Sequence, residues 1–215
     1  FTIDSGSLEF AVLFENEGPY DYVLNLSALK HVRSERDPYT LMQMINVNIL
    51  NAVKNIEQSI SNGVKKYFAV STDKASSPIN LMGASKKIME FYMANYCKNI
   101  NISSARFANV AFSDGSLLDS FLKRFHAKQP LSGPSGIKRY FITPKESGQL
   151  CLLSTIMGSN NELFIPKIRN KLYPISFEVI AKNFLESMGF EPIMFQSEKK
   201  AKSNFDKLYS ENKWA

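Results

Sequence analysis

Residues 64–86 read VKKYFAVSTDKASSPINLMGASK, which joins a strand pattern to a polar turn and then to a helical pattern. The run Val64–Val70 is largely apolar and bounded by turn residues, so it predicts a buried strand. Positions 71–74 then bring two hydroxyls, one acid and one amine into a single turn. Open α/β sheets place their chemistry at the carboxyl ends of their strands, so this turn is the first candidate for a functional site.

Strand and helix patterns alternate on both sides of this stretch. We expect strands at 22–27, 64–71, 102–107 and 163–165, and helices at 37–61, 81–98, 116–127, 144–157 and 177–188. Alternation at this spacing predicts βαβ units that build a parallel sheet with right-handed crossovers. The fold class is therefore α/β, with a doubly wound parallel sheet over residues 1–135. The mixed pattern of residues 136–215 predicts a small C-terminal α/β lobe, intermixed with residues 107–135.

The composition limits the classes of partner. The 215 residues carry a net charge of +6 and the basic residues are scattered, so we expect no nucleic acid but an anionic small substrate such as a nucleotide diphosphate. No apolar run reaches the ~18 residues that span a bilayer, so we expect no membrane contact by this segment. Cys97 and Cys151 lie in apolar helical patterns, which favours packing roles in a reducing cytoplasm. No Cys/His spacing indicates a metal site.

Six blocks of sequence carry a resemblance to a known superfamily. They are ALKHVRSERDP (28–38), NVNIL (46–50), STDKA (71–75), NLMGASK (80–86), RFANVAFSDGS (106–116) and RYFIT (139–143). In this order they resemble the extended short-chain dehydrogenase/reductase superfamily. Within it, they are most similar to the UDP-N-acetylglucosamine 4,6-dehydratases of polysaccharide biosynthesis. The resemblance runs from about residue 4 to residue 165.

The resemblance implies a Rossmann-like NAD-binding domain, followed by a C-terminal lobe that binds the substrate. It also implies tightly held NAD, a UDP-sugar substrate and a homo-oligomer. The reaction of that branch oxidises the sugar at C4, eliminates water across C5 and C6, and returns the hydride to C6. The product is a 4-keto-6-deoxy sugar nucleotide.

Two departures from the superfamily pattern bear on this assignment: the first indicates that the chain taken alone binds NAD poorly, and the second narrows the assignment. The glycine-rich turn that holds the pyrophosphate after the first strand is absent, so about two N-terminal βα units are missing from the expected Rossmann fold. Met82 occupies the position where most of the superfamily has its catalytic tyrosine. Methionine at this position is typical of a subset of the dehydratases, and it argues against a dedicated C4 epimerase.

The resemblance assigns the proton chemistry to the turn after the predicted strand. Elimination of water needs a base for the C5 proton and an acid for the departing C6 hydroxyl. Asp73 is implied as the acid, Lys74 as the base, and Thr72 as the residue that orients the C4 hydroxyl. Lys86, four residues after Met82 on the same helical face, is implied to bind the nicotinamide ribose and to supply positive charge. The group that deprotonates the C4 hydroxyl stays unassigned.

The remaining candidates bind the cofactor or the substrate. The cofactor set implied by the resemblance is Asp4 at the adenine, Ala28, Leu29, Lys30, Asn48 and Ser71, together with Lys86. The substrate set is Met82, Asn109, Ser116 and Arg139. In this set Ser116 opens a helix, and Arg139 can bind a diphosphate through two hydrogen bonds. Structural alternatives stay open, namely a solvated surface for the charged residues and core packing for Met82.

Three functions are compatible with the sequence. The first is NAD-dependent dehydration of a UDP-N-acetylhexosamine, UDP-N-acetylglucosamine above all, in bacterial surface polysaccharide synthesis. The second is epimerisation of a nucleotide sugar on the same scaffold. The third is a truncated, non-catalytic chain that binds nucleotide sugars or assembles with partners. The product that the full-length protein forms would separate them.

Overall fold

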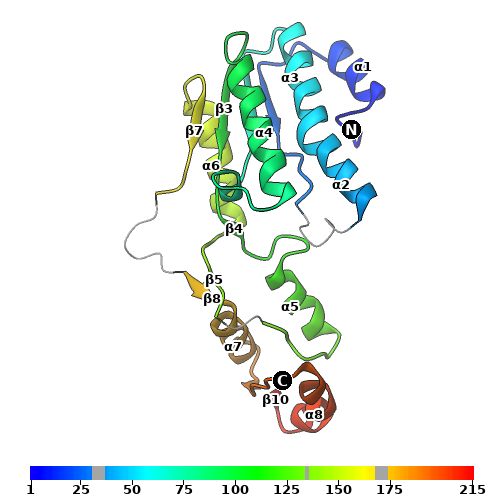
Figure 1. Cartoon of the computed structure of the whole chain (residues 1–215), viewed down its shortest axis with the longest axis vertical. Helices are drawn as coiled ribbons and strands as arrows, with labels where there is room; N and C mark the ends of the chain where they lie inside the picture. Colours follow the sequence, from blue (N-terminus) through cyan, green and yellow to red (C-terminus); the bar gives the residue numbers. More distant parts are fainter. Residues whose placement is uncertain (31–36, 134–135, 168–173) are drawn as a thin grey trace. The chain divides into compact units, whose positions relative to one another are not determined.

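The computed structural model describes residues 1–30, 37–133, 136–167 and 174–215. The chain divides into two compact units. We call them the sheet unit, Phe1–Phe107 with Lys145–Lys167, and the second unit, Ala108–Pro144 with Ile168–Ala215 (Figure 1). Residues 31–36, which belong to the first of the six sequence blocks, lie outside the described residues.

Four parallel strands form the sheet, in the order β1-β2-β3-β7. Their bounds are β1 Tyr22–Asn25, β2 Lys66–Val70, β3 Asn101–Ala105 and β7 Glu162–Phe164. In the register Leu24 lies beside Phe68, and Phe68 lies beside Ser103. β1 is at one edge of this sheet, and its side chains Tyr22 and Leu24 are exposed. The parallel sheet confirms the predicted α/β class.

Helices cover both faces of the sheet. The helices of this unit are α1 (Leu8–Asn16), α2 (Pro38–Ile45), α3 (Asn51–Ser61), α4 (Leu81–Tyr96) and α6 (Pro144–Met157). Successive residues of a strand point to opposite faces, so Tyr67 packs in a cluster with Ile56 of α3 and Met89 of α4. Phe68 points the other way and packs with Cys151 of α6. This arrangement is the doubly wound sheet that the alternating sequence pattern predicts.

Local signals in the sequence begin and end the long helical segment between β1 and β2. Asp37 caps α2 because its carboxylate accepts a hydrogen bond from the Thr40 backbone N–H at 2.8 Å. α2 continues into α3 through a π-helical turn, η2 (Asn46–Leu50), so the single helix predicted for 37–61 contains one irregular turn. Gly63 follows the helix with a positive φ of 69°, a conformation that glycine adopts readily.

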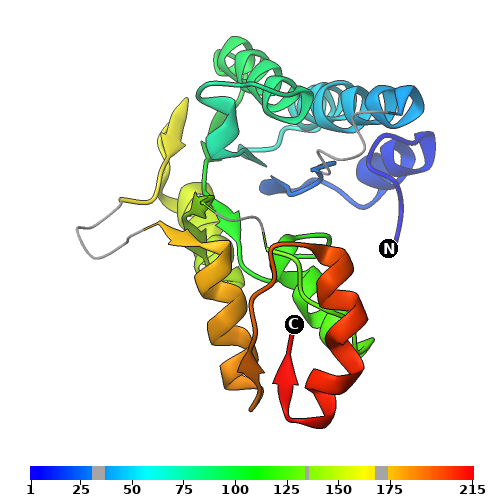
Figure 2. The same ribbon diagram turned by 60° about the horizontal axis from the view of Figure 1, so that its bottom comes forward.

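The second unit is built around an aromatic core. Its described elements are the helices α5 (Leu117–His126), α7 (Phe177–Ser187) and α8 (Glu198–Ser210), and the strand pairs β4 (Asn109–Val110) with β6 (Phe141–Ile142), β5 (Lys138–Arg139) with β8 (Ile175–Ser176), and β9 (Glu191–Pro192) with β10 (Lys213–Trp214). Trp214 is 1% exposed and stacks on Phe125, with 4.6 Å between the ring centroids. Figure 2 shows β10 between α7 and α8, so Trp214 ties the last residues of the chain into this core.

The sequence predicts a division at residue 135 with residues 107–135 intermixed with the C-terminal lobe, whereas the second unit begins at Ala108 and residues 145–167 return to the sheet unit. α6 and β7 belong to the sheet unit, because β7 pairs with β3 and places Phe164 beside Ala105. The sequence predicts both elements but not the sheet that they join. The helix α1 and the two-residue strands of the second unit are not among the predicted elements. Cys151 lies in the core, where burial raises the pKa of its thiol.

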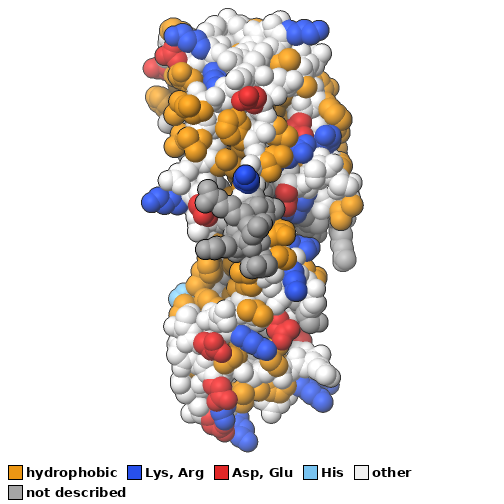
Figure 3. All heavy atoms as spheres, turned by 90° about the vertical axis from the view of Figure 1, so that its left-hand side faces the viewer, with side chains coloured by type: hydrophobic (Ala, Val, Ile, Leu, Met, Phe, Trp, Pro, Cys, Tyr) orange, Lys and Arg blue, Asp and Glu red, His pale blue; other side chains and the backbone are white. Residues whose placement is uncertain are grey.

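Hydrophobic side chains also gather at the surface of the sheet unit. Figure 3 shows the side that carries β7, and the exposed apolar residues of α6 and β7 are Leu152, Leu153, Ile156, Met157 and Leu163. In the part of the chain that the structure describes, no helix has both the length and the hydropathy to cross a membrane.

Candidate active site

The segment after β2, residues 71–75, is fixed to the end of the neighbouring strand β3, and we call it the β2 turn. The backbone N–H groups of Ser71 and Asp73 donate to the carbonyls of Ala105 and Phe107, at 2.9 and 3.3 Å. A short 3₁₀ helix, η3, covers residues 73–75. The side chains of the β2 turn are therefore held at the carboxyl end of the sheet, where the sequence places the chemistry.

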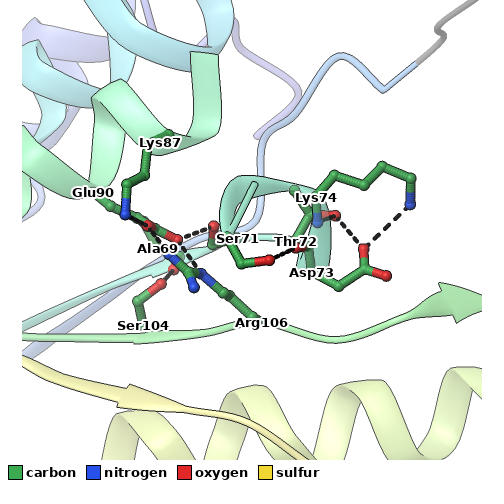
Figure 4. A network of polar contacts seen from close by, with 10 residues as sticks. Ala69, Ser71, Thr72, Asp73, Lys74, Lys87, Glu90, Ser104 and Arg106 are labelled. Atoms are coloured by element: carbon green, nitrogen blue, oxygen red, sulfur yellow. Dashed lines mark hydrogen bonds and ion pairs between the residues drawn. The ribbon is translucent and has the colours of Figure 1, made fainter. Parts of the chain in front are cut away.

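Three of the predicted catalytic residues meet on the β2 turn (Figure 4). The Thr72 hydroxyl donates to Asp73 Oδ1 at 3.0 Å, and Lys74 Nζ lies 3.2 Å from the same oxygen. The side chains of Asp73 and Lys74 are 48% and 35% exposed, so a ligand can reach both. An acid and an amine within hydrogen-bond distance can exchange one proton, which is what paired acid and base chemistry requires.

The start of α4 packs directly on the backbone of the β2 turn. Asn80 caps this helix by accepting a hydrogen bond from the Gly83 N–H at 2.9 Å. A Cβ atom at Gly83 would lie 2.7 Å from the Lys74 carbonyl oxygen, so a larger residue would push the turn away. Met82, a predicted substrate contact, is buried. The N-x-M-G spacing therefore combines a helix cap with close packing against the acid–base pair.

Lys86 is buried in α4 and reaches the segment after β1, residues 27–30, which we call the β1 loop. Its ammonium group donates to the Ser27 carbonyl at 3.4 Å. Burial lowers the pKa of Lys86 to about 8, although the negative charge of Glu90 opposes this shift. Lys86 therefore joins α4 to the loop that the resemblance assigns to the cofactor.

Asn48 fixes the β1 loop through the backbone of Leu29. Its Oδ1 accepts from the Leu29 N–H and its Nδ2 donates to the Leu29 carbonyl, both at 2.9 Å. The same Nδ2 donates to the Ser85 hydroxyl of α4 at 3.0 Å. Asn48 lies in the π-helical turn η2, an irregularity that often occurs at functional sites. Its amide is engaged with protein groups, so it supports the exposed neighbours Ala28 and Lys30.

A charged network lies beside the β2 turn (Figure 4). Ser71 Oγ donates to Glu90 Oε1 at 2.5 Å, and Arg106 Nε donates to the same oxygen at 2.8 Å. The Arg106 Nη2 group bonds the second carboxylate oxygen, so the pair is bidentate. The hydrogen bond with Glu90 raises the pKa of Arg106. Ser71, a predicted cofactor contact, directs its hydroxyl to this carboxylate.

Sequence reasoning missed Glu90 and Ser85 as members of the site. Glu90 lies four residues after Lys86 on the same face of α4, and this spacing is the signal that could have identified it. The Ser85 hydroxyl donates to the Met82 carbonyl at 2.9 Å while it accepts from Asn48. A serine inside a helical pattern carries no comparable signal, because most such hydroxyls bond only the preceding turn.

Asp4, the predicted adenine contact, lies in the turn that precedes α1. Its Oδ1 accepts from the Gly6 N–H at 2.9 Å, and its carbonyl accepts from the Ser7 N–H at 3.0 Å. Ser7 in turn caps α1. The aspartate is exposed, and its contact with adenine stays a prediction.

Three of the predicted substrate residues lie in the second unit. Ser116 caps α5, where its Oγ accepts from the Asp119 N–H at 3.1 Å. Asn109 Nδ2 donates to the Tyr140 carbonyl at 3.4 Å, and Arg139 is exposed on β5. Their contacts with a substrate stay predictions.

Curated proteins with similar sequences are of several kinds. A UDP-N-acetylglucosamine 4,6-dehydratase (inverting) of Campylobacter jejuni is 34% identical over 155 residues, which cover 69% of this chain and 46% of that protein. A UDP-glucose 4-epimerase of Rickettsia akari is 31% identical over 88% of this chain and 56% of that protein. An uncharacterized membrane protein of Methanocaldococcus jannaschii is 29% identical over 89% of this chain and 59% of that protein. The chain thus spans about half the length of the curated relatives it matches.

A solved structure with a similar fold is a double mutant of the dTDP-glucose 4,6-dehydratase of Streptomyces venezuelae, which contains NAD. The TM-score is 0.74 at 17% sequence identity, over 87% of this chain and 62% of that one. This likeness agrees with the Rossmann-like sheet described above. The family described as polysaccharide biosynthesis protein matches residues 9–205, which is most of the chain. The chain therefore belongs to the polysaccharide biosynthesis protein family, a branch of the extended short-chain dehydrogenase/reductase superfamily.

Proposed function

We propose that this chain is part of an NAD-dependent nucleotide-sugar 4,6-dehydratase that acts on a UDP-N-acetylhexosamine, with UDP-N-acetylglucosamine as the first substrate to test. The observation that carries the proposal is the contact of Asp73 Oδ1 with both Thr72 Oγ1 and Lys74 Nζ at the carboxyl end of β2. The relatives support the substrate class, because they include a UDP-N-acetylglucosamine 4,6-dehydratase and a UDP-glucose 4-epimerase.

The pair of Asp73 and Lys74 can supply both proton transfers of the elimination. When a bound sugar covers the pair and excludes water, the charged forms lose hydration, and one proton can cross the 3.2 Å contact from Lys74 to Asp73. Neutral Lys74 then takes the C5 proton, and the C5–H electron pair forms the C5–C6 double bond. The C6–O bond breaks as the Asp73 acid protonates the departing oxygen. Water leaves, and the pair returns to its ionic form.

Thr72 suits an orienting role. A threonine hydroxyl is too weak an acid to serve readily as a base. Its own proton is directed to Asp73, so its oxygen can accept a hydrogen bond from a sugar hydroxyl. Thr72 would therefore hold the C4 hydroxyl next to the acid–base pair. Met82, which is buried, can contribute only shape and apolar contact there.

The residues around the β1 loop fit the nicotinamide half of NAD. Bound NAD supplies the hydride acceptor for C4 and the hydride donor for C6. Lys86 is a buried cation beside this loop, which suits the hydroxyl groups of a ribose, and Asn48 holds the Leu29 backbone in place. The 215 residues contain no glycine-rich turn for the pyrophosphate, so they account for only this half of the cofactor.

The product formed by the full-length protein tests the proposal. The NAD-loaded protein is incubated with UDP-N-acetylglucosamine in heavy water, and the product is examined by mass spectrometry and NMR. We expect a 4-keto-6-deoxy sugar that has lost one water and carries solvent deuterium at C5, because the base exchanges that proton. UDP-glucose and UDP-N-acetylgalactosamine under the same conditions define the preferred sugar.

Two other results would contradict the proposal and assign a different function. An epimeric sugar of unchanged composition would identify an epimerase, the reaction named for the relative of Rickettsia akari. No turnover by a protein that holds NAD and binds the nucleotide sugar would identify a non-catalytic binding chain.

A further inference from the structure

Glu90 joins three elements of the sheet unit at one carboxylate. It lies on α4 and accepts a hydrogen bond from the hydroxyl of Ser71, in the segment after β2. Both of its oxygens bind Arg106 at the end of β3. The side chains of Glu90 and Arg106 are each 12% exposed, so the pair is largely removed from solvent. Its partners directly follow two neighbouring strands, Ser71 after β2 and Arg106 after β3, and the proposed acid–base pair lies on the segment after β2.

We propose that Glu90 is a positioning residue that holds the β2 turn in place, through Ser71 and Arg106, for the reaction of Asp73 and Lys74. The inference rests on the proposed function, because it gives Glu90 a role in that same site. Glu90 itself contacts neither reacting residue in the described hydrogen bonds and ion pairs; it acts through Ser71.

Ser71 is fixed at two points, and the position of the residues that follow it depends on its conformation. Its backbone N–H donates to the Ala105 carbonyl at 2.9 Å, while its hydroxyl donates to Glu90. Thr72 is the next residue, and its hydroxyl binds the Asp73 carboxylate. A rotation of the backbone at Ser71 would therefore move Thr72 and Asp73 together, and the Glu90 contact opposes that rotation.

The charge of Glu90 has a second effect, on Lys86 one helical turn earlier. Burial lowers the pKa of Lys86, and the Glu90 carboxylate raises it in part. The other charged side chains on the surrounding elements are Lys30, Asp73, Lys74, Lys87 and Arg106. The charge that raises the pKa of Lys86, against the effect of burial, is that of Glu90. The same residue thus supports the β2 turn and keeps Lys86 protonated to higher pH.

Two variants of the full-length protein separate these effects. Glu90→Gln keeps the size and an oxygen for Ser71 but removes the charge, and Ser71→Ala removes the hydroxyl alone. The matched control is Glu57→Gln on α3, which also accepts a hydroxyl hydrogen bond, from Tyr96 at 2.5 Å, but lies outside the network. Each variant is assayed for kcat, KM and the pH dependence of kcat/KM with the nucleotide sugar that the wild type converts.

We expect Glu90→Gln to lower kcat by about 10- to 100-fold, with KM nearly unchanged, because small displacements of reacting groups are costly. The alkaline limb of its kcat/KM profile should move to lower pH, since Lys86 loses the charge that sustains its protonation. Ser71→Ala should lower kcat without moving that limb. Turnover of Ser71→Ala equal to wild type, turnover of Glu90→Gln equal to Glu57→Gln, or an unshifted alkaline limb in Glu90→Gln would each overturn the inference.

Amide hydrogen exchange of residues 71–75, measured without substrate, keeps this test independent of the proposed function. Glu90→Gln should exchange faster there than Glu57→Gln, and equal rates would overturn the inference. If the full-length protein converts no nucleotide sugar, the proposed function fails, whereas faster exchange at these amides would still show that Glu90 holds the turn.

Discussion

The β1 loop and the β2 turn both follow the carboxyl ends of parallel strands, but different side chains hold them in place. A neutral amide, Asn48, binds both backbone groups of Leu29 in the β1 loop. A carboxylate, Glu90, binds the hydroxyl of Ser71 in the β2 turn and is itself neutralised by Arg106. The β1 loop offers mainly backbone and apolar groups, whereas the β2 turn carries its own acid and amine. The comparison shows a neutral amide and one buried ammonium group at the loop proposed to bind the cofactor, and a carboxylate paired with a guanidinium at the turn proposed to move protons.

The largest effect should come from the pair that makes the β2 turn different. Asp73→Asn and Lys74→Ala should each lower kcat by about 10²- to 10⁴-fold, the usual range for a general acid or base, with little change in stability. The matched control is another Asp–Lys pair, Asp21 and Lys65, which is 2.7 Å apart and exposed before β1 and β2. Asp21→Asn and Lys65→Ala should keep normal turnover. Near-normal product formation by either variant of the β2 turn would remove its assigned role.

Lys86 should make the stability of the protein depend on alkaline pH. Its folded-state pKa of about 8 lies below the usual 10.5, so the unfolded chain binds more protons between these values, and stability rises with pH through that window. The gain is on the order of 3 kcal/mol at 1.36 kcal/mol per pKa unit. Urea unfolding across this range should show the rise in wild type and in the exposed control Lys98→Met, but not in Lys86→Met. Parallel curves for all three would contradict the burial of the Lys86 charge.

Removing the support of the β1 loop should cost less. Asn48→Ala removes the three hydrogen bonds of a buried amide and leaves the Leu29 backbone without these partners. We expect a loss of about 2 to 3 kcal/mol in the free energy of unfolding, and weaker NAD binding by the full-length protein. Asn99→Ala, an exposed position after α4, is the control. If Asn48→Ala binds NAD as tightly as the wild type, the β1 loop does not contribute to cofactor binding as proposed.

The smallest effect should come from the contact between α4 and the β2 turn. Gly83→Ala forces a Cβ to within 2.7 Å of the Lys74 carbonyl, which should destabilise the protein by about 1 to 2 kcal/mol and lower turnover. Gly148→Ala in α6 meets no atom within 4 Å and should stabilise the protein by about 0.5 to 1 kcal/mol. Thermal unfolding of the two variants decides this, and equal shifts in the same direction would refute the close packing.

The sequence predicts the parts of this fold that depend on local patterns. The alternating strands and helices and the polar residues after β2 follow from periodicity and turn chemistry, and the structure brings Thr72, Asp73 and Lys74 together as expected. The pairing of β7 with β3 does not follow, because the first segment of the second unit, Ala108–Pro144, and the helix α6 lie between the two strands in the sequence. This is why the predicted boundary at residue 135 differs from the division into units.

The supporting residues of the candidate site were harder to predict than the proposed acid and base. An acid and an amine in a turn indicate a candidate site by residue type alone. Ser85 acquires its role only when folding brings Asn48 beside it. In the sequence Glu90 is one more charge in a helical pattern, and its role depends on Arg106 and Ser71, which bind it only in the folded chain. Such residues are defined by partners distant in sequence, and a single sequence carries little information about them.

The exposed edge of β1 has a practical consequence for work on these 215 residues produced by themselves. Tyr22 and Leu24 present apolar side chains on a strand whose outer side pairs with no described strand. Such an edge is a template for pairing with other chains, so concentrated samples are prone to self-association. Dilute handling, and light scattering alongside every binding measurement, will keep the properties of the folded chain distinct from those of its aggregates.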